Sequence, residues 1–161
     1  MLNNLKNKID AVLKWILVVI MAVMTTNVLW QVFSRFVLQN PSSFTDELAR
    51  YLLVWVGILG AGYVAGQKMH LAIDLLSTKL EGRSKSYLEI FIESCVFIFS
   101  LVVMVIGGIR LVFITLNLNQ ISAALQIPLG YVYLAVPISG LLMMFYSVFY
   151  IKEELKKLKT Y

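Results

Sequence analysis

Cysteine and histidine, which supply most redox and metal centres, are almost absent from this chain of 161 residues, which has one of each. The single cysteine, Cys95, excludes an internal disulfide and a paired-cysteine redox site. Membrane haem proteins use paired histidines and intramembrane zinc proteases use a His-Glu-x-x-His motif, so a single histidine excludes both. His70 could serve a serine protease only inside the bilayer, and the charged residues Lys68 and Asp74 near it argue against that depth. We therefore predict no enzyme, no metal site and no cofactor.

Charged residues are scarce as well, at 14% of the chain against about 25% in an average soluble domain, while hydrophobic residues reach 60%. The hydrophobic residues are concentrated in four long stretches, and each approaches or exceeds the ~20 residues that cross the hydrocarbon core of a bilayer. Backbone amides inside lipid must bond within their own segment, which favours helices. We expect an all-α membrane protein, a single domain over residues 1–161, with four transmembrane helices at about 12–36, 44–67, 87–114 and 127–151.

Positive charge is distributed unevenly around these stretches. The net charge is +5, and eleven of the 14 lysines and arginines lie before the first stretch, between the second and third, or after the fourth. Under the positive-inside rule, this distribution places both termini in the cytoplasm. Because the charge is explained as a topology signal, we expect no nucleic acid partner.

The loop between the first two helices is predicted to be structured. Pro41 ends the first helix, and Ser43 can cap a second helix that begins near Phe44, with Asp46 in its first turn. We expect this turn to form a short interfacial helical segment at the outer membrane surface.

The loop between the second and third helices is predicted to contain another interfacial helix. Leucines recur at helical spacing between His70 and Leu80, with polar side chains off that stripe. His70 and Asp74 lie four residues apart, a spacing that some metal sites use, but no second histidine or thiolate is near them. We expect the pair to make a capping or orienting hydrogen bond instead.

Charged residues gather where the first helix ends and the second begins. Arg35 lies at the end of the first helix, and Glu47 and Arg50 lie in the first turns of the second. A lone carboxylate at this depth is costly, so we predict that Glu47 pairs with an arginine. The sequence leaves open which arginine this is, and the alternative is that both extend separately toward the lipid headgroups.

The centres of the predicted helices carry no charge, whereas an independent ion-coupled transporter usually needs a carboxylate near the midplane. Thr25, Thr26 and Asn27 are expected to face a neighbouring helix. Small residues in the second helix allow close packing, either inside this subunit or against another polypeptide. These small residues are Gly57, Gly62, Gly66, Ala61 and Ala65.

Two of the three prolines lie in the fourth predicted helix. Pro128 is placed at the start, where a helix tolerates proline. Pro137 lies inside the helix together with Gly140, and this combination predicts a kink.

Two groups of residues, spread over most of the chain, form a pattern when they are taken together. The first group contains Val28, Arg35, Phe36, Phe44, Glu47, Leu48, Ala49, Arg50, Tyr51, Trp55, Gly60, Ala61, His70 and Asp74. The second group contains Leu125, Ile127, Pro128, Tyr131, Pro137 and Gly140. The pattern resembles the signatures of the small membrane subunit of tripartite ATP-independent periplasmic (TRAP) transporters, the DctQ-like family. Two positions differ from that family: Phe44 stands where tryptophan is common, and Ala123 stands where proline often follows a serine or threonine.

The resemblance implies a bacterial inner-membrane protein, surrounded by membrane lipids, that pairs with a much larger membrane subunit. The large subunit would move sodium and an organic anion, such as a C4-dicarboxylate or sialic acid, by an elevator motion. A periplasmic substrate-binding protein would deliver the anion, and the small subunit would brace the static scaffold without binding substrate. The structural or partner-facing residues that the resemblance implies are Arg35, Glu47, Arg50, Trp55, Gly60, His70, Asp74, Pro128 and Pro137.

Two other functions stay open. One is a self-sufficient four-helix exporter that acts as a homodimer, but such proteins generally carry a glutamate in the first helix, and residues 15–34 hold no ionisable side chain. The other is a membrane assembly factor of unrelated origin. The transported substrate, the stoichiometry and the lipid contacts cannot be deduced from the sequence.

Overall fold

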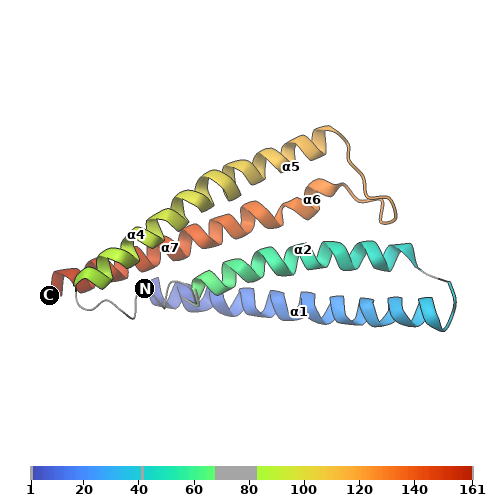
Figure 1. Ribbon diagram of the computed structural model, residues 1–161, viewed down its shortest axis with the longest axis horizontal. Helices are drawn as coiled ribbons and strands as arrows, with labels where there is room; N and C mark the ends of the chain where they lie inside the picture. The colour runs from blue at the N-terminus through green and yellow to red at the C-terminus, as the bar shows by residue number, and fades with distance from the viewer. Residues whose placement is uncertain (1, 41, 68–82, 161) are drawn as a thin grey trace.

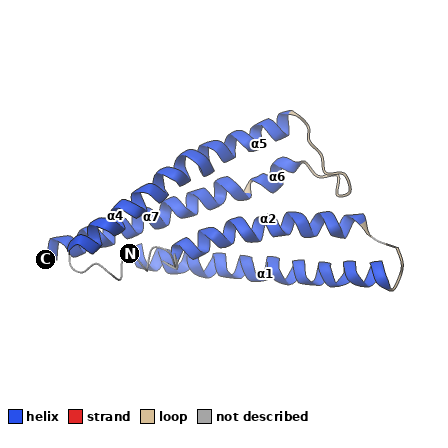
Figure 2. Cartoon of the chain, in the orientation of Figure 1, coloured by secondary structure: helices blue, strands red, loops and turns tan. Residues whose placement is uncertain are grey.

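The computed structural model describes residues 2–40, 42–67 and 83–160, and most of these residues are helical (Figure 1, Figure 2). The helices are α1 (Leu2–Phe36), α2 (Ser43–Gly66), α4 (Arg83–Phe99), the π-helix η1 (Ser100–Gly107), α5 (Gly108–Asn117), α6 (Leu129–Tyr133) and α7 (Ala135–Thr160). Because α4, η1 and α5 run on as one helix, the described residues contain four helices that are long and apolar enough to cross a membrane. The predicted all-α fold with four spans is confirmed.

The four spans stand side by side in a single row. α1 packs on α2, α2 packs on α7, and α7 packs on α4 and η1, so the order across the row is α1, α2, α7, α4. Both termini lie at one end of the row, which we call the termini end (Figure 1). The α1–α2 connection and the loop of residues 118–128 lie at the opposite end, which we call the loop end.

Three helices extend further than their apolar stretches. α1 begins at Leu2 instead of near residue 12, α4 begins at Arg83 instead of near residue 87, and α7 continues to Thr160 instead of ending near residue 151. The predicted bounds followed hydrophobicity, which marks only the part of a helix that lipid surrounds, whereas a polar helical segment can continue past it. At about 1.5 Å per residue, the 35 residues of α1 measure about 52 Å, well beyond a hydrocarbon core of about 30 Å.

The described part of the connection between α1 and α2, residues 37–40 and 42, contains no helix. Residues 37–40 form turns and bends, and α2 begins directly at Ser43 with Ser42 as its N-cap. The predicted helical turn after Pro41 is present as the first turn of α2, and the N-cap is Ser42 instead of the predicted Ser43. The predicted interfacial helix from His70 to Leu80 lies outside the described residues.

The last span is interrupted near its start. Pro128 is the N-cap of α6, which ends at Tyr133, and α7 begins at Ala135 after a single turn residue. Pro137 has no N–H to donate to the carbonyl of Tyr133 four residues earlier, so regular helical bonding cannot continue through this point. The predicted irregularity at Pro137 is therefore present as a break.

Close packing joins α2 to α7, η1 and α5 to α7, and α6 to α5. A Cβ added to Gly62 would lie 2.8 Å from Ser139 Oγ, and one added to Gly66 would lie 2.5 Å from the Tyr146 ring. A Cβ on Gly140 would meet Met104 at 2.7 Å. Glycine at these positions lets the helices approach closely. Some of the small residues of α2 therefore serve packing inside this subunit.

Candidate functional site

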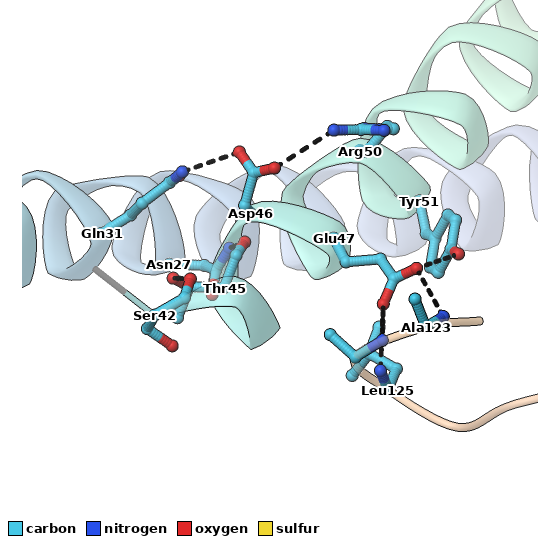
Figure 3. A network of polar contacts seen from close by, with 11 residues as sticks. Asn27, Gln31, Ser42, Thr45, Asp46, Glu47, Arg50, Tyr51, Ala123 and Leu125 are labelled. Carbon is cyan, nitrogen blue, oxygen red and sulfur yellow. Dashed lines mark hydrogen bonds and ion pairs between the residues drawn. The ribbon is translucent and has the colours of Figure 1, made fainter. Parts of the chain in front are cut away.

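Charged and polar side chains from three segments meet at the loop end of the row. The segments are the end of α1, the first turns of α2 and the loop of residues 118–128, and we call this region the corner (Figure 3). Its central side chain is Glu47, which points from α2 toward the loop.

The Glu47 carboxylate accepts hydrogen bonds from three consecutive backbone amides of the loop. The Ala123 N–H donates to Oε1 at 3.2 Å, and the N–H groups of Ala124 and Leu125 donate to Oε2 at 2.7 and 3.0 Å. The Tyr51 hydroxyl, one turn further along α2, donates to Oε1 at 2.7 Å. Successive backbone amides that converge on one anion form a concave anion-binding geometry, so a single carboxylate fixes the loop against α2.

The loop is folded so that these amides can converge. Asn119 and Gln126 have positive φ angles of 48° and 56°, which reverse the chain on either side of the amides. The Ser122 N–H donates to the Ile127 carbonyl at 2.9 Å, which closes the turn between the two reversals. At Ala123, where the resembling family often has proline, alanine retains the N–H that reaches Glu47.

The predicted pairing of Glu47 with an arginine is wrong. Arg50 binds Asp46 instead, with Nη2 and Oδ2 3.1 Å apart, and Gln31 of α1 donates to the other oxygen of Asp46 at 2.8 Å. Residues 46 and 50 are four apart and share a face of α2, whereas Glu47 points from another side of the helix toward the loop (Figure 3). The loop amides, which no sequence pattern indicated, supply the stabilisation that an arginine was expected to give.

Arg35 takes no part in the hydrogen bonds of Glu47 or in the ion pair of Asp46. It is exposed and forms no ion pair with any residue in the ranges that the structure describes. It lines a surface pocket of about 350 Å³ together with Gln31, Ser42, Ser43 and Asp46. Arg35 and Arg50 thus both lie near Asp46, whose carboxylate is already bonded to Arg50 and Gln31.

A second contact ties α1 to α2 near the corner. Asn27 donates to the backbone carbonyl of Thr45 at 2.7 Å, as expected for a polar side chain that faces a neighbouring helix. Thr25 and Thr26 are exposed, and their hydroxyls donate to the carbonyls of Met21 and Ala22 in α1 itself, while Thr26 also lines a pocket between α1 and α2. Their hydroxyls are thus satisfied within α1, and the expectation that both threonines face a neighbouring helix stays a prediction.

The remaining predicted site residues lie in different places. Trp55 is half-buried on the same face of α2 as Glu47 and Tyr51, because the three are four residues apart. Gly60 lies further along α2, and a Cβ added there would meet no atom within 4 Å. Pro128 and Pro137 flank α6, and His70 and Asp74 fall outside the described residues.

At the termini end, a polar cluster surrounds Asp10, and it was not predicted from the sequence. Lys6 and Gln67 donate to Asp10 Oδ2 at 2.8 and 3.2 Å, and the Tyr146 hydroxyl donates to Oδ1. Tyr150 donates to the backbone carbonyl of Gly66 close by. Together these bonds join α1, α2 and α7. The opposite charges of Lys6 and Asp10 at helical spacing were the only available signal, and that spacing becomes meaningful only if the helix extends to the N-terminus.

α4 and α7 are joined at the same end by Glu154. The Ser86 hydroxyl donates to Glu154 Oε2 at 3.2 Å, and Lys157 Nζ lies 2.6 Å from Oε1. Glu154 is only 2% exposed, so its charge depends on these partners. Within the ranges described, no group of three His, Cys, Asp or Glu side chains is placed to hold a metal ion.

Comparison with known proteins places these features in a family context. Residues 21–157 match the family model described as tripartite ATP-independent periplasmic transporters, DctQ component. A putative TRAP transporter small permease protein of Haemophilus influenzae is 28% identical over 142 residues, which are 88% of this chain and 86% of that protein. The sialic acid TRAP transporter small permease protein SiaQ of Vibrio cholerae is 28% identical over 107 residues, which are 66% of this chain and 60% of that protein.

A longer protein also contains a segment similar to this chain. The sialic acid TRAP transporter permease protein SiaT of Haemophilus influenzae is 30% identical over 117 residues, which are 71% of this chain. Those residues make up only 18% of SiaT, so the similar segment is a small part of a larger permease.

Proposed function

The chain belongs to the DctQ component family of tripartite ATP-independent periplasmic transporters, and we propose that it braces the large membrane subunit of such a transporter. It is a small permease component and a multi-pass protein of the inner membrane. The transporter would use sodium to take up an organic anion that a periplasmic substrate-binding protein delivers. The brace would hold still while the transport domain of the large subunit moves.

The observation that carries this proposal is the use of four carboxylates as links inside the chain. Asp10 joins α1 to α2 and α7, and Asp46 joins α2 to α1. Glu47 joins α2 to the loop, and Glu154 joins α7 to α4. Carboxylates bonded in this way stabilise the arrangement of helices, and a fixed arrangement is what a scaffold requires.

The orientation belongs to the same proposal. The termini end carries most of the lysines and arginines and would lie in the cytoplasm. The corner would then lie at the periplasmic surface, where the binding protein arrives. No Asp, Glu, Lys, Arg or His lies between residues 15 and 34 or between residues 111 and 151, which supports a role without a substrate or ion site of its own.

Reconstitution tests the proposed role. Liposomes would contain the large permease subunit from the same genome, with or without this chain, and would receive the binding protein, radiolabelled sialic acid or C4-dicarboxylate, and an inward sodium gradient. We expect uptake only when both membrane subunits and sodium are present. Equal uptake by the large subunit alone would contradict the bracing role.

The same assay separates the proposal from the exporter alternative. Liposomes that contain this chain alone should show no movement of these anions in either direction. Transport by the chain alone would favour a self-sufficient homodimeric carrier. If this chain does not co-purify with the large subunit, and if deleting this chain leaves uptake unchanged, the assembly-factor alternative is favoured.

A further inference from the structure

The glycines of α2 divide the helix into a filled face and an open face. Gly62 and Gly66 lie against side chains of α7, so a Cβ at either position would lie within 3 Å of its neighbour. A Cβ added to Gly57 or Gly60 would meet no atom within 4 Å. Gly57 and Gly60 are therefore not needed for any close approach within the described chain.

Exposed residues continue from Gly57 and Gly60 along one side of α2. Leu53 is 59% exposed and Val64 is 40% exposed, and both lie three or four residues from a glycine of the set. We call Leu53, Gly57, Gly60, Ala61 and Val64 the open face of α2. Glycine weakens a helix when nothing requires it, whereas in a membrane it allows another helix to approach closely.

The open face continues into the corner pocket. Asp46 and Arg50 precede Leu53 at the same three- and four-residue spacing, so the charged residues and the open face share one side of α2. Asp46, Gln31 and Arg50 lie together on another side of α2 than Glu47 (Figure 3). This side is distinct from the one that the loop occupies.

The corner pocket is lined by one guanidinium, that of Arg35, and one carboxylate, that of Asp46. Asp46 is bonded by Arg50 and Gln31, while Arg35 has no ion pair among the residues described and lines the same pocket. A guanidinium at a membrane surface favours a carboxylate partner with matching geometry. The pocket can therefore accept an acidic group from outside this chain.

We infer that the open face of α2 and the corner pocket together seat one transmembrane helix of the large permease subunit, which presents a carboxylate to Arg35. This inference rests on the proposed function. The occupant is chosen because the segment similar to this chain in SiaT is joined covalently to the rest of a much longer permease, which favours a larger membrane protein as the neighbour of a chain of this kind. The glycines provide the close contact, and Arg35 sets the height of the partner helix along α2.

Leucine substitutions test the close contact. The large subunit would carry an affinity tag, and the amount of this chain that co-purifies in detergent would be measured. Gly57→Leu and Gly60→Leu should each lower that amount about tenfold, as expected for the loss of one close helix contact. The control is Gly107→Leu, because Gly107 is also exposed and a Cβ there would meet only a carbonyl of its own helix at 3.6 Å. Gly107→Leu should co-purify like the wild type.

A charge pair tests the corner pocket in the same assay. Arg35→Gln should lower co-purification several-fold, and raising the salt concentration should narrow the difference from the wild type. Arg110→Gln is the matched control, because Arg110 is likewise exposed but lies on α5, away from the open face. Equal effects of the two substitutions would overturn the role of Arg35.

Crosslinking keeps the inference testable if a leucine variant fails to fold. A photoreactive amino acid would replace Leu53, which is 59% exposed, or Ile106, which is 58% exposed and lies on η1. Irradiation of the complex should link position 53 to the large subunit and leave position 106 unlinked. A link from position 106 alone would overturn the inference.

The outcomes separate this inference from the proposed function. If the wild type does not co-purify with the large subunit, the proposed function fails. If it co-purifies and the Gly57 and Gly60 variants do so equally well, the partner uses another surface and only the inference fails. If those variants lose self-association while the complex persists, the open face contacts a second copy of this chain, which also overturns the inference.

Discussion

Replacing Gly66 by alanine should weaken the junction at which α1, α2 and α7 meet. The added Cβ would lie 2.5 to 2.7 Å from three atoms of the Tyr146 ring. Ordinary contact begins near 3.4 Å, so the ring would have to retreat by almost 1 Å. Tyr146 is only 1% exposed and its hydroxyl donates to Asp10, so the ring has little room to move.

The size of the effect follows from two opposing contributions. Overpacking a filled site costs about 1–3 kcal/mol. Replacing glycine by alanine inside a helix contributes about 1 kcal/mol in the opposite direction. Gly60→Ala shows the second contribution alone, because a Cβ there meets nothing within 4 Å. The free energies of unfolding of the two variants should therefore differ by about 1–3 kcal/mol, with Gly66→Ala the less stable.

Thermal unfolding of the detergent-solubilised chain, followed by circular dichroism, measures this difference. For a chain of this size a change of 1 kcal/mol shifts the melting temperature by roughly 2–4 °C. Adding Tyr146→Leu, which removes the ring atoms, should abolish most of the extra cost of Gly66→Ala, and a double-mutant cycle would report the coupling. Equal melting temperatures for Gly66→Ala and Gly60→Ala would refute the close contact between α2 and α7.

Three further substitutions test other contacts. Glu47→Ala should release the loop of residues 118–128, so the loop should become more sensitive to protease, and complex formation and uptake should fall. Asp46→Asn is the control, because it leaves the loop amides bonded to Glu47. Unchanged proteolysis of the Glu47→Ala variant would contradict the link between Glu47 and the loop. Ser100→Ala should raise stability by about 1 kcal/mol in the same thermal assay, because the Ser100 hydroxyl is fully buried and has no hydrogen-bond partner among the described residues; a loss of stability would show that the hydroxyl is bonded. Asn27→Ala should lower stability by about 1 kcal/mol through the lost bond to the Thr45 carbonyl, and no change would indicate that water replaces the side chain.

The number and type of spans could be predicted because lipid imposes a simple rule on the sequence. A stretch of apolar residues that is long enough must be helical, so the four spans followed from composition and length alone. The break before Ala135 followed from Pro137, since proline removes a helical hydrogen bond wherever it stands. Asn27 was correctly placed against a neighbouring helix because its amide cannot be satisfied well by its own helix.

The partner of Glu47 could not be predicted in the same way. Its hydrogen bonds come from backbone amides 76 to 78 residues away, and backbone amides leave no mark in the sequence. Charge pairing was the available argument, and it favoured an arginine that turned out to bind Asp46. The cluster around Asp10 could not be predicted for a related reason. Gln67 and Tyr146 reach Asp10 only because α2 and α7 pack together.

The π-helix η1 had no signal in the sequence at all. Its eight residues, Ser100 to Gly107, are apolar apart from the first, and any of them would suit an ordinary membrane helix. The irregularity arises where the helix passes α7, with Gly108 against Pro137 and Gly140 against Met104. Such a departure is set by two helices together, so neither segment indicates it alone.

The single-file arrangement of α1, α2, α7 and α4 has a consequence for permeation. The spans that the structure describes form a layer one helix thick, and such a layer encloses no lumen. A solute could cross the bilayer beside such a wall but not through it. Any translocation path that this protein helps to form must therefore have its other side built by another polypeptide chain, either a different protein or a second copy of this one.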